Sequence, residues 1–232
     1  MPKLLSIETS SEACSVALAL NGEVFEKFEH EPMQHAELIL PMVQTLLAEC
    51  ELPLGALDAI AFGRGPGSFT SLRIGIGVVQ GLAWGADVPV VPVSSLAAVA
   101  QVAFGQLSDP GIARICVAMD ARMQEVYSAE FTLDENGLAS PVSAEIVCSP
   151  KTILAQLPVG EYSAICGAGN GFARYTELDE LGTELGMCLP GCWPRAGAIS
   201  RLAEAWLIHN SPLPAALAQP VYIRDKVAEK SA

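Results

Sequence analysis

The stretch Phe62–Gly77, FGRGPGSFTSLRIGIG, joins an apolar segment to an amphipathic one through a run of glycines. Residues 57–62 form a short apolar run with the length of a buried strand. Beyond the glycines, Leu72 and Ile76 begin a helical spacing of apolar residues that continues to about Trp84. The stretch therefore predicts a strand–turn–helix unit, around which the rest of the chain must be arranged.

The turn itself spans residues 63–67, where glycine permits a positive φ angle and proline fixes the bend. Ser68 or Thr70 can cap the helix that follows. A glycine-rich loop at a helix N-terminus can hold an anion. However, no Gly-Lys-Ser/Thr follows, so this is not a Walker loop, and no dinucleotide fingerprint completes the pattern. The alternative is a tight connection without a ligand, which the local sequence favours because isolated glycine loops are weak signals.

The helix after the turn carries glycine at every fourth position, at Gly77, Gly81 and Gly85. These positions share one helix face and allow another backbone to approach closely. Each glycine costs a helix roughly 1 kcal/mol relative to alanine. Three on one face therefore indicate that something packs there, either this chain or another.

Composition restricts the function. The chain has 232 residues, a formal net charge of −13 and a hydrophobic share of 51%. Such a charge repels phosphate backbones, so direct binding of nucleic acid is not expected. The seven cysteines form no CxxC motif, which is typical of reduced thiols, and no signal peptide or membrane-spanning run is recognisable. We therefore expect a cytoplasmic protein that makes no contact with a membrane.

The expected elements follow the same order twice. Residues 1–105 read as three strands, a helix, a strand and a further helix, and a strong turn signal at residues 109–111 follows. The second strand is expected at residues 14–20, and Asn21-Gly22 predicts a hairpin turn to the third. Residues 106–232 repeat this order in a degenerate form, with the third strand expected at residues 142–147. The C-terminal helix, expected at residues 196–209, can pack back on the first half. We predict an α/β protein with the actin-like ATPase (ASKHA, ribonuclease H-like) fold, built from two β-β-β-α-β-α subdomains with mixed sheets.

A resemblance to a known family rests on the glycine stretch. The run Gly63–Thr70, with Leu72-Arg73-Ile74-Gly75, resembles the signature of the bacterial TsaB family, also called YeaZ and peptidase M22-like. At Ser71 the sequence departs from the glycine expected in most relatives. Weaker similarities extend along nearly the whole chain, at Ile7-Glu8-Thr9-Ser10, His35-Ala36-Glu37, Leu40-Pro41, Asp120-Ala121-Arg122, Tyr127 and Pro220-Val221-Tyr222-Ile223-Arg224.

The resemblance implies a non-catalytic scaffold for tRNA modification. In this family's system the threonylcarbamoyl group is transferred to N6 of the adenosine next to the anticodon (t6A modification). The resemblance implies a heterodimer with the paralogue TsaD, which carries the catalytic metal site, contact with the ATPase TsaE, and a homodimer. It implies that tRNA is reached only through the complex. No cofactor is expected on this chain alone, and ATP would enter at the level of the complex.

A stand-alone actin-like ATPase or kinase is one alternative. Glu8, Thr9 and Ser10 occupy the position of the first phosphate turn in such enzymes, although the usual residue at the first position is Asp. Gly167 and Gly169 lie where the adenosine-contacting loop of the second half would be. Neither turn is diagnostic. Asp120 would be the candidate catalytic carboxylate, and a structural carboxylate at a strand end is the other interpretation.

An M22-type peptidase is the second alternative. The three histidines, His30, His35 and His209, include no HxxxH or HExxH pair. His35, at the start of a helix, is better explained by capping or packing than by metal binding. No Gly-x-Ser-x-Gly elbow is present. We expect neither catalytic nor metal-binding residues.

The helices that begin near residues 35 and 69 carry more apolar residues than one buried face needs. If their exposed faces align, they form a patch of the kind that marks a partner site and could serve a homodimer or a heterodimer of like folds. The alternative is that both helices pack on their own sheet. We expect Met42→Glu or Gly81→Glu to weaken association while the monomer stays folded. The expected interface residues are Leu38, Met42, Val43, Leu46, Ile74, Gly77, Val78, Gly81, Leu82 and Gly85.

Overall fold

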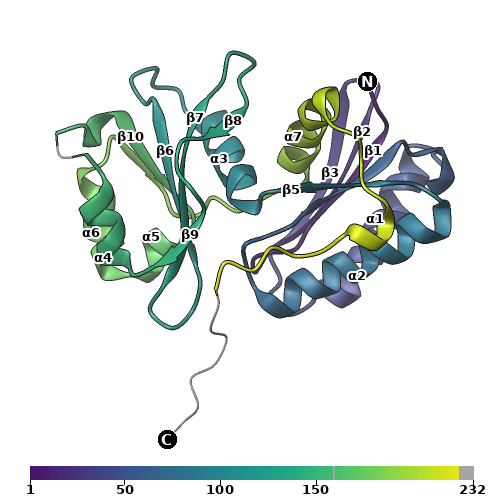
Figure 1. The fold of residues 1–232 in the computed structure, drawn as a ribbon, viewed down its shortest axis with the longest axis horizontal. Coiled ribbons are helices and arrows are strands. Elements are labelled where there is room, and N and C mark those ends of the chain that lie inside the picture. Colours follow the sequence, from purple (N-terminus) through teal and green to yellow (C-terminus); the bar gives the residue numbers. More distant parts are fainter. Residues whose placement is uncertain (159, 225–232) are drawn as a thin grey trace, which may run out of the picture.

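The computed structural model describes residues 1–158 and 160–224, so Val159 and the last eight residues of the expected second subdomain lie outside the described residues. Figure 1 shows two sheets side by side, each flanked by helices. The first half contains β1 (Leu4–Glu8), β2 (Cys14–Leu20), β3 (Glu23–Glu29), α1 (His35–Glu49), β4 (Ala59–Gly63), α2 (Phe69–Ala86), β5 (Val90–Val93) and α3 (Ser95–Gln106).

The second half has the same order, with its third strand and its second helix each divided in two. The elements of the second half are β6 (Arg114–Asp120), β7 (Val126–Leu133), β8 (Ala139–Pro141), β9 (Ile146–Cys148), α4 (Pro150–Gln156), β10 (Ile165–Ala168), α5 (Gly171–Arg174), α6 (Thr176–Glu184), β11 (Met187–Leu189) and α7 (Ala196–His209). Short 3-10 helices at Leu54–Ala56, Tyr162–Ala164 and Ala215–Leu217 complete the described chain.

The two sheets share one strand order. The first runs β3-β2-β1-β4-β5, and the second runs β8-β7-β6-β10-β11, with β9 also paired to β7. In each sheet the first strand of the half is antiparallel to the second and parallel to the fourth. This repeated mixed topology is the ribonuclease H-like, actin-like arrangement expected from the sequence.

The third strand of the second half differs from the expectation of one strand over residues 142–147. The structure has two short strands instead: β8 pairs with the end of β7 and β9 with its beginning. Between them the chain leaves the sheet, because the Glu145 carboxylate turns toward the first half. It accepts hydrogen bonds from the guanidinium of Arg64 and the hydroxyl of Ser94.

The two halves exchange helices. Helices α1 and α2 cover one face of the first sheet, and α7 covers its other face through Ala198, Ile199 and Ala203. Helix α3, from the first half of the sequence, packs on the second sheet, where Leu96 and Phe104 belong to the core with β6 and β7. The division into subdomains at residue 105 stays a prediction, because α3 and α7 both pack across it.

The helices were also compared with the length and hydropathy of a membrane span. Within residues 1–158 and 160–224, no helix combines the length and the apolar character that a membrane crossing requires.

Candidate functional site

Three of the four glycines within residues 63–75 lie against the end of β1 and the first turn of the chain, residues 9–11, which follows it. Glu8 and the residues of this turn are buried. Glycine is required where the two segments touch, because a side chain would overlap the turn. A β-carbon would lie 2.0 Å from Glu8 Oε2 at Gly63, 2.2 Å from the Ser10 carbonyl oxygen at Gly67, and 2.1 Å from Thr9 Oγ1 at Gly75.

The contact between the glycine turn and the first turn also occupies a backbone amide at the start of α2 that a bound anion would need. The amide of Ser68 donates to the carbonyl oxygen of Ser10, 2.7 Å away. The Ser68 hydroxyl makes no capping bond to α2 and lies 2.9 Å from the Ser71 hydroxyl instead. The structure therefore explains the glycine turn as a tight connection, and the expected side-chain cap is wrong for Ser68.

Glu8 is fully buried and does not line the cavity between the two halves. Its carboxylate accepts hydrogen bonds from the amide of Ser10 at 2.6 Å and from the hydroxyl of Ser95 at 2.8 Å. Burial raises the pKa of Glu8, although these hydrogen bonds oppose the shift. Thr9 is also buried and donates to the carbonyl oxygen of Ser71 at 3.0 Å. Of the three residues in the expected phosphate turn, only Ser10 reaches the cavity between the halves.

Gly167 and Gly169 have a packing explanation. A β-carbon at Gly167 would lie 2.6 Å from Cζ of Phe172. Gly169 has a φ of +105°, and its β-carbon would lie 2.6 Å from the carbonyl oxygen of Ala118. Both glycines are therefore needed where β10 and α5 meet β6, and they give no independent support to nucleotide binding.

A cavity of about 750 Å³ lies between the two halves. Its walls come from the first turn, the glycine turn, the loop after β6 and the C-terminal segment. The lining residues are Ser10, Ser11, Glu12, Pro32, Met33, His35, Pro66, Gly67, Ser68, Phe69, Thr70, Ser71, Ile74, Met119, Asp120, Ala121, Arg122, Met123, Tyr127, Asn170, Val221, Tyr222, Ile223 and Arg224.

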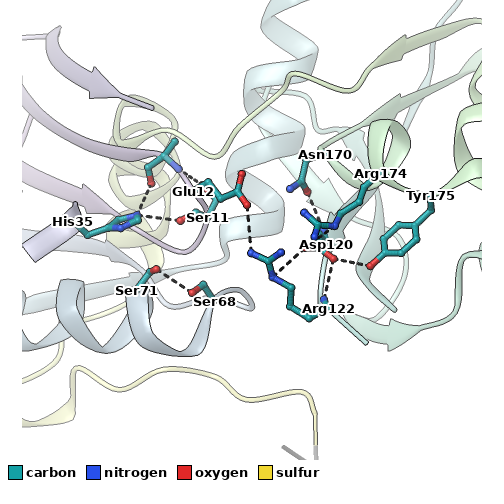
Figure 2. A network of polar contacts seen from close by, with 11 residues as sticks. Ser11, Glu12, His35, Ser68, Ser71, Asp120, Arg122, Asn170, Arg174 and Tyr175 are labelled. Atoms are coloured by element: carbon teal, nitrogen blue, oxygen red, sulfur yellow. Dashed lines mark hydrogen bonds and ion pairs between the residues drawn. The ribbon is translucent and has the colours of Figure 1, made fainter. Parts of the chain in front are cut away.

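Asp120 holds one wall of this cavity together, as Figure 2 shows. Its carboxylate is only 4% exposed and forms ion pairs with Arg122 and Arg174, both at 3.3 Å. The Tyr175 hydroxyl donates to it at 2.6 Å. Burial and the contact with the Asp120 carboxylate raise the pKa of Tyr175 to about 12. The amide of Asp120 is held by Asn170 at 2.9 Å. With its oxygens occupied in this way, Asp120 fits a structural carboxylate better than a catalytic one.

The loop after β6 is a feature that the sequence analysis missed. Arg122, Met123 and Gln124 all have positive φ angles, of 62°, 54° and 60°. Such backbone is uncommon for residues other than glycine. The loop aims the Arg122 guanidinium across the cavity at Glu12, 3.3 Å away (Figure 2). No local sequence pattern predicts this conformation. The sequence pointed to this loop only through the Asp120-Ala121-Arg122 motif of the family resemblance.

His35 has a structural role. It is buried, and its Nε2 lies 3.0 Å from the carbonyl oxygen of Ser11 and 3.2 Å from that of Ala13 (Figure 2). Because both neighbours are acceptors, Nε2 carries the hydrogen and donates. Packing of His35 was the expected interpretation. Among the described residues, no group of three or more His, Cys, Asp or Glu side chains is placed to hold a metal ion.

The expected interface residues fall into three groups. Met42, Val43 and Leu46 are buried in the core between α1 and the first sheet. They were expected at a partner surface, but their helical spacing identifies the face of α1 that packs on the sheet. Leu38, Ile74, Val78 and Leu82 are partly buried at the edge of that core. Gly77, Gly81 and Gly85 face outward, and among the described residues outside their own helix backbone nothing lies within 4 Å of an added β-carbon.

Trp84 was not among the expected interface residues. Its side chain is 77% exposed on α2, and it follows Gly77 by seven residues and Gly81 by three. These three residues therefore share one side of the helix, with Gly85 beside them. The spacing of Trp84 from Gly77 and Gly81 in the sequence could have identified it as an interface residue. In the sequence analysis Trp84 served only to mark the end of the expected helix.

Fold and cavity define a class. Two copies of one mixed topology, with a cavity between them, make this an actin-like protein of the ribonuclease H-like fold. Side chains of the chain itself form the hydrogen bonds and ion pairs of the cavity wall at Asp120 and of the first turn at Glu8.

Comparisons with known proteins identify the family. The model of the TsaD family, tRNA N6-adenosine threonylcarbamoyltransferase, matches residues 29–176. The tRNA threonylcarbamoyladenosine biosynthesis protein TsaB of Escherichia coli is 40% identical, over 98% of this chain and 97% of the relative. The Haemophilus influenzae protein of the same name is 36% identical, over 98% and 95%. The structure of YeaZ from Pseudomonas aeruginosa, 39% identical, superposes with a TM-score of 0.84 over 96% of this chain and all of that one. The chain belongs to the TsaB (YeaZ) family.

Proposed function

We propose that this chain is a non-catalytic scaffold subunit in t6A modification of tRNA, acting in the cytoplasm with TsaD and TsaE. Its TsaB relatives are named as tRNA threonylcarbamoyladenosine biosynthesis proteins. The observation that carries the scaffold role is the outer face of α2. There, among the described residues outside α2's own backbone, no atom lies within 4 Å of a β-carbon added at Gly77, Gly81 or Gly85, and Trp84 stands exposed beside them.

That face suits a partner helix. Glycines at fourth positions leave a shallow groove in which another helix can approach closely. Helix propensity argues against such glycines unless they serve a contact, since each costs roughly 1 kcal/mol. An exposed tryptophan at the edge of the groove is typical of a residue that contributes much of the binding energy at an interface.

A partner of the same fold is the best match. The TsaD family model covers residues 29–176, which include α1 and α2. A TsaD partner therefore carries related helices, and two such pairs can pack about a pseudo-two-fold axis. The same surface serves a homodimer through a true two-fold axis. The proposed contact residues are Leu38, Ile74, Gly77, Val78, Gly81, Leu82, Trp84 and Gly85.

Charge supports an indirect role toward tRNA. The net charge of −13 opposes contact with a phosphate backbone, so a partner must supply the basic surface. All seven cysteines are free thiols, as a reducing compartment favours.

The test is reconstitution of the reaction. Purified TsaD, TsaE, the threonylcarbamoyl donor, ATP and unmodified tRNA are incubated with and without this chain, and the modified adenosine is quantified by mass spectrometry. We expect modification only when the chain is present, and co-purification of TsaD with it. The Trp84→Ala variant should lose both. Equal modification without the chain would refute the proposal.

A further inference from the structure

After α7 the chain returns to the first half and then crosses toward the second. Leu213 forms an antiparallel bridge with Val90, in which each amide donates to the other residue's carbonyl oxygen at 2.8 Å. The 3-10 helix Ala215–Leu217 then packs against α2. We call residues 218–224 the C-terminal strap. In Figure 1 it is the yellow segment that passes α2 and continues toward the second half.

Hydrogen bonds attach the strap to the first half at three points, all near or on α2. One point is the glycine turn and two are side chains of the helix. The Gln80 side chain donates to the Ala218 carbonyl oxygen at 2.8 Å, the Val221 amide donates to the Arg64 carbonyl oxygen at 2.8 Å, and Arg73 Nε donates to the Tyr222 hydroxyl at 2.9 Å.

The end of the described strap reaches the second half. The side chain of Arg224 is only 14% exposed, and its guanidinium pairs with the Glu125 carboxylate. Its Nη1 lies 3.1 Å from the sulfur of Met123. Met123 is one of the three left-handed residues of the loop after β6, and Glu125 directly follows them. The same loop sends Arg122 across the cavity to Glu12. The strap thus connects α2 to the loop that closes the cavity.

The α2 side chains that hold the strap lie on the same face as the glycines. Arg73, Gly77, Gln80, Gly81 and Trp84 follow the spacing i, i+4, i+7, i+8, i+11, which places them along one stripe of the helix. A helix packed on the glycines therefore lies beside the Arg73 and Gln80 side chains.

We propose that the strap links partner binding on α2 to closure of the cavity between the two halves, an inference that rests on the proposed partner surface. A partner on the stripe restricts Arg73 and Gln80 to the conformations that hold the strap. The strap then keeps Arg224 on Glu125 and so holds the loop after β6 in place. The Glu125 side chain is 40% exposed, and an ion pair with a solvated carboxylate adds little stability, so the free chain opens this contact more often than the bound chain. By linkage, closure also strengthens partner binding.

The experiment measures hydrogen exchange of peptides that cover residues 119–127, with and without purified TsaD. The Arg224→Gln variant removes the strap's ion pair. The Arg114→Gln variant is a matched control, because it removes the 3.1 Å pair with Glu130 inside the second half. We expect TsaD to slow exchange of this loop in the wild type and in Arg114→Gln. In Arg224→Gln we expect exchange of the free chain to be about two- to fivefold faster and the partner-induced slowing to disappear.

The outcomes separate this proposal from the proposed function. If TsaD binds and slows the loop equally in Arg224→Gln, or does not slow it in the wild type, the link through the strap is overturned while the partner surface stands. If the wild-type chain binds no TsaD at all, the partner surface fails and the link fails with it.

Discussion

A β-carbon on Gly63 would lie 2.0 Å from the carboxylate oxygen of Glu8, so the end of β4 and the end of β1 can meet only through glycine. We predict that Gly63→Ala lowers the free energy of unfolding by about 1–3 kcal/mol, the usual cost of overpacking a buried site. Denaturant unfolding followed by circular dichroism measures it. Gly55→Ala is the control, because nothing lies within 4 Å of its added β-carbon. Equal stability of both variants would show that the turn around Glu8 is not tightly packed.

The buried carboxyl of Glu8 makes stability depend on pH. Burial raises its pKa in the folded protein above the ordinary value of 4.5, so over that interval the folded state binds more protons than the unfolded state. Stability therefore falls as pH rises from about 4.5 through the folded pKa. Glu8→Gln cannot titrate, and we predict that it lacks this fall. The measurement is the difference in melting temperature between wild type and variant as a function of pH, and a difference that is constant with pH would contradict the prediction.

Gly81 allows folding and association to be tested separately. Its added β-carbon meets nothing within 4 Å, so Gly81→Ala should stabilise the isolated chain by about 1 kcal/mol through helix propensity. The same methyl group occupies the groove of the proposed partner surface, so affinity for TsaD should fall. Gly105→Ala, near the end of α3, meets nothing either and should stabilise the fold without changing affinity. Calorimetric melting and isothermal titration measure the two quantities. Unchanged affinity in Gly81→Ala would place the partner elsewhere.

Local patterns were enough to locate most elements of the fold. The expected strand at 14–20 and helix at 196–209 have the bounds that the structure shows. The Asn21-Gly22 hairpin is confirmed, with positive φ at both residues. Each of these elements is set by residues close in sequence, through alternation, helical spacing or turn chemistry.

What local patterns missed depends on distant contacts. The third strand of the second half is divided because Glu145 turns to Arg64, 81 residues away in sequence. The crossing of α3 to the second sheet is likewise absent from any local pattern. Packing of the C-terminal helix on the first half was stated only as a possibility, and α7 does pack there. Spacing identified Met42 as part of an apolar face, but only packing shows that this face meets the sheet.

Trp84 and Met42 make the contrast between the outer and inner faces of this helix pair measurable. Met42 is 6% exposed in the core, so Met42→Glu buries an unpaired charge and should unfold or strongly destabilise the chain. This prediction replaces the one made from the sequence, which was weaker association of a monomer that stays folded. Trp84 is 77% exposed, so Trp84→Ala should change the free energy of unfolding by no more than about 0.5 kcal/mol. If it anchors the partner, the same change should weaken TsaD binding by about 2 kcal/mol or more, roughly thirtyfold in affinity. Denaturant unfolding and isothermal titration on both variants test this. A folded Met42→Glu chain with normal stability, or a Trp84→Ala chain with normal affinity, would reverse the assignment of that face.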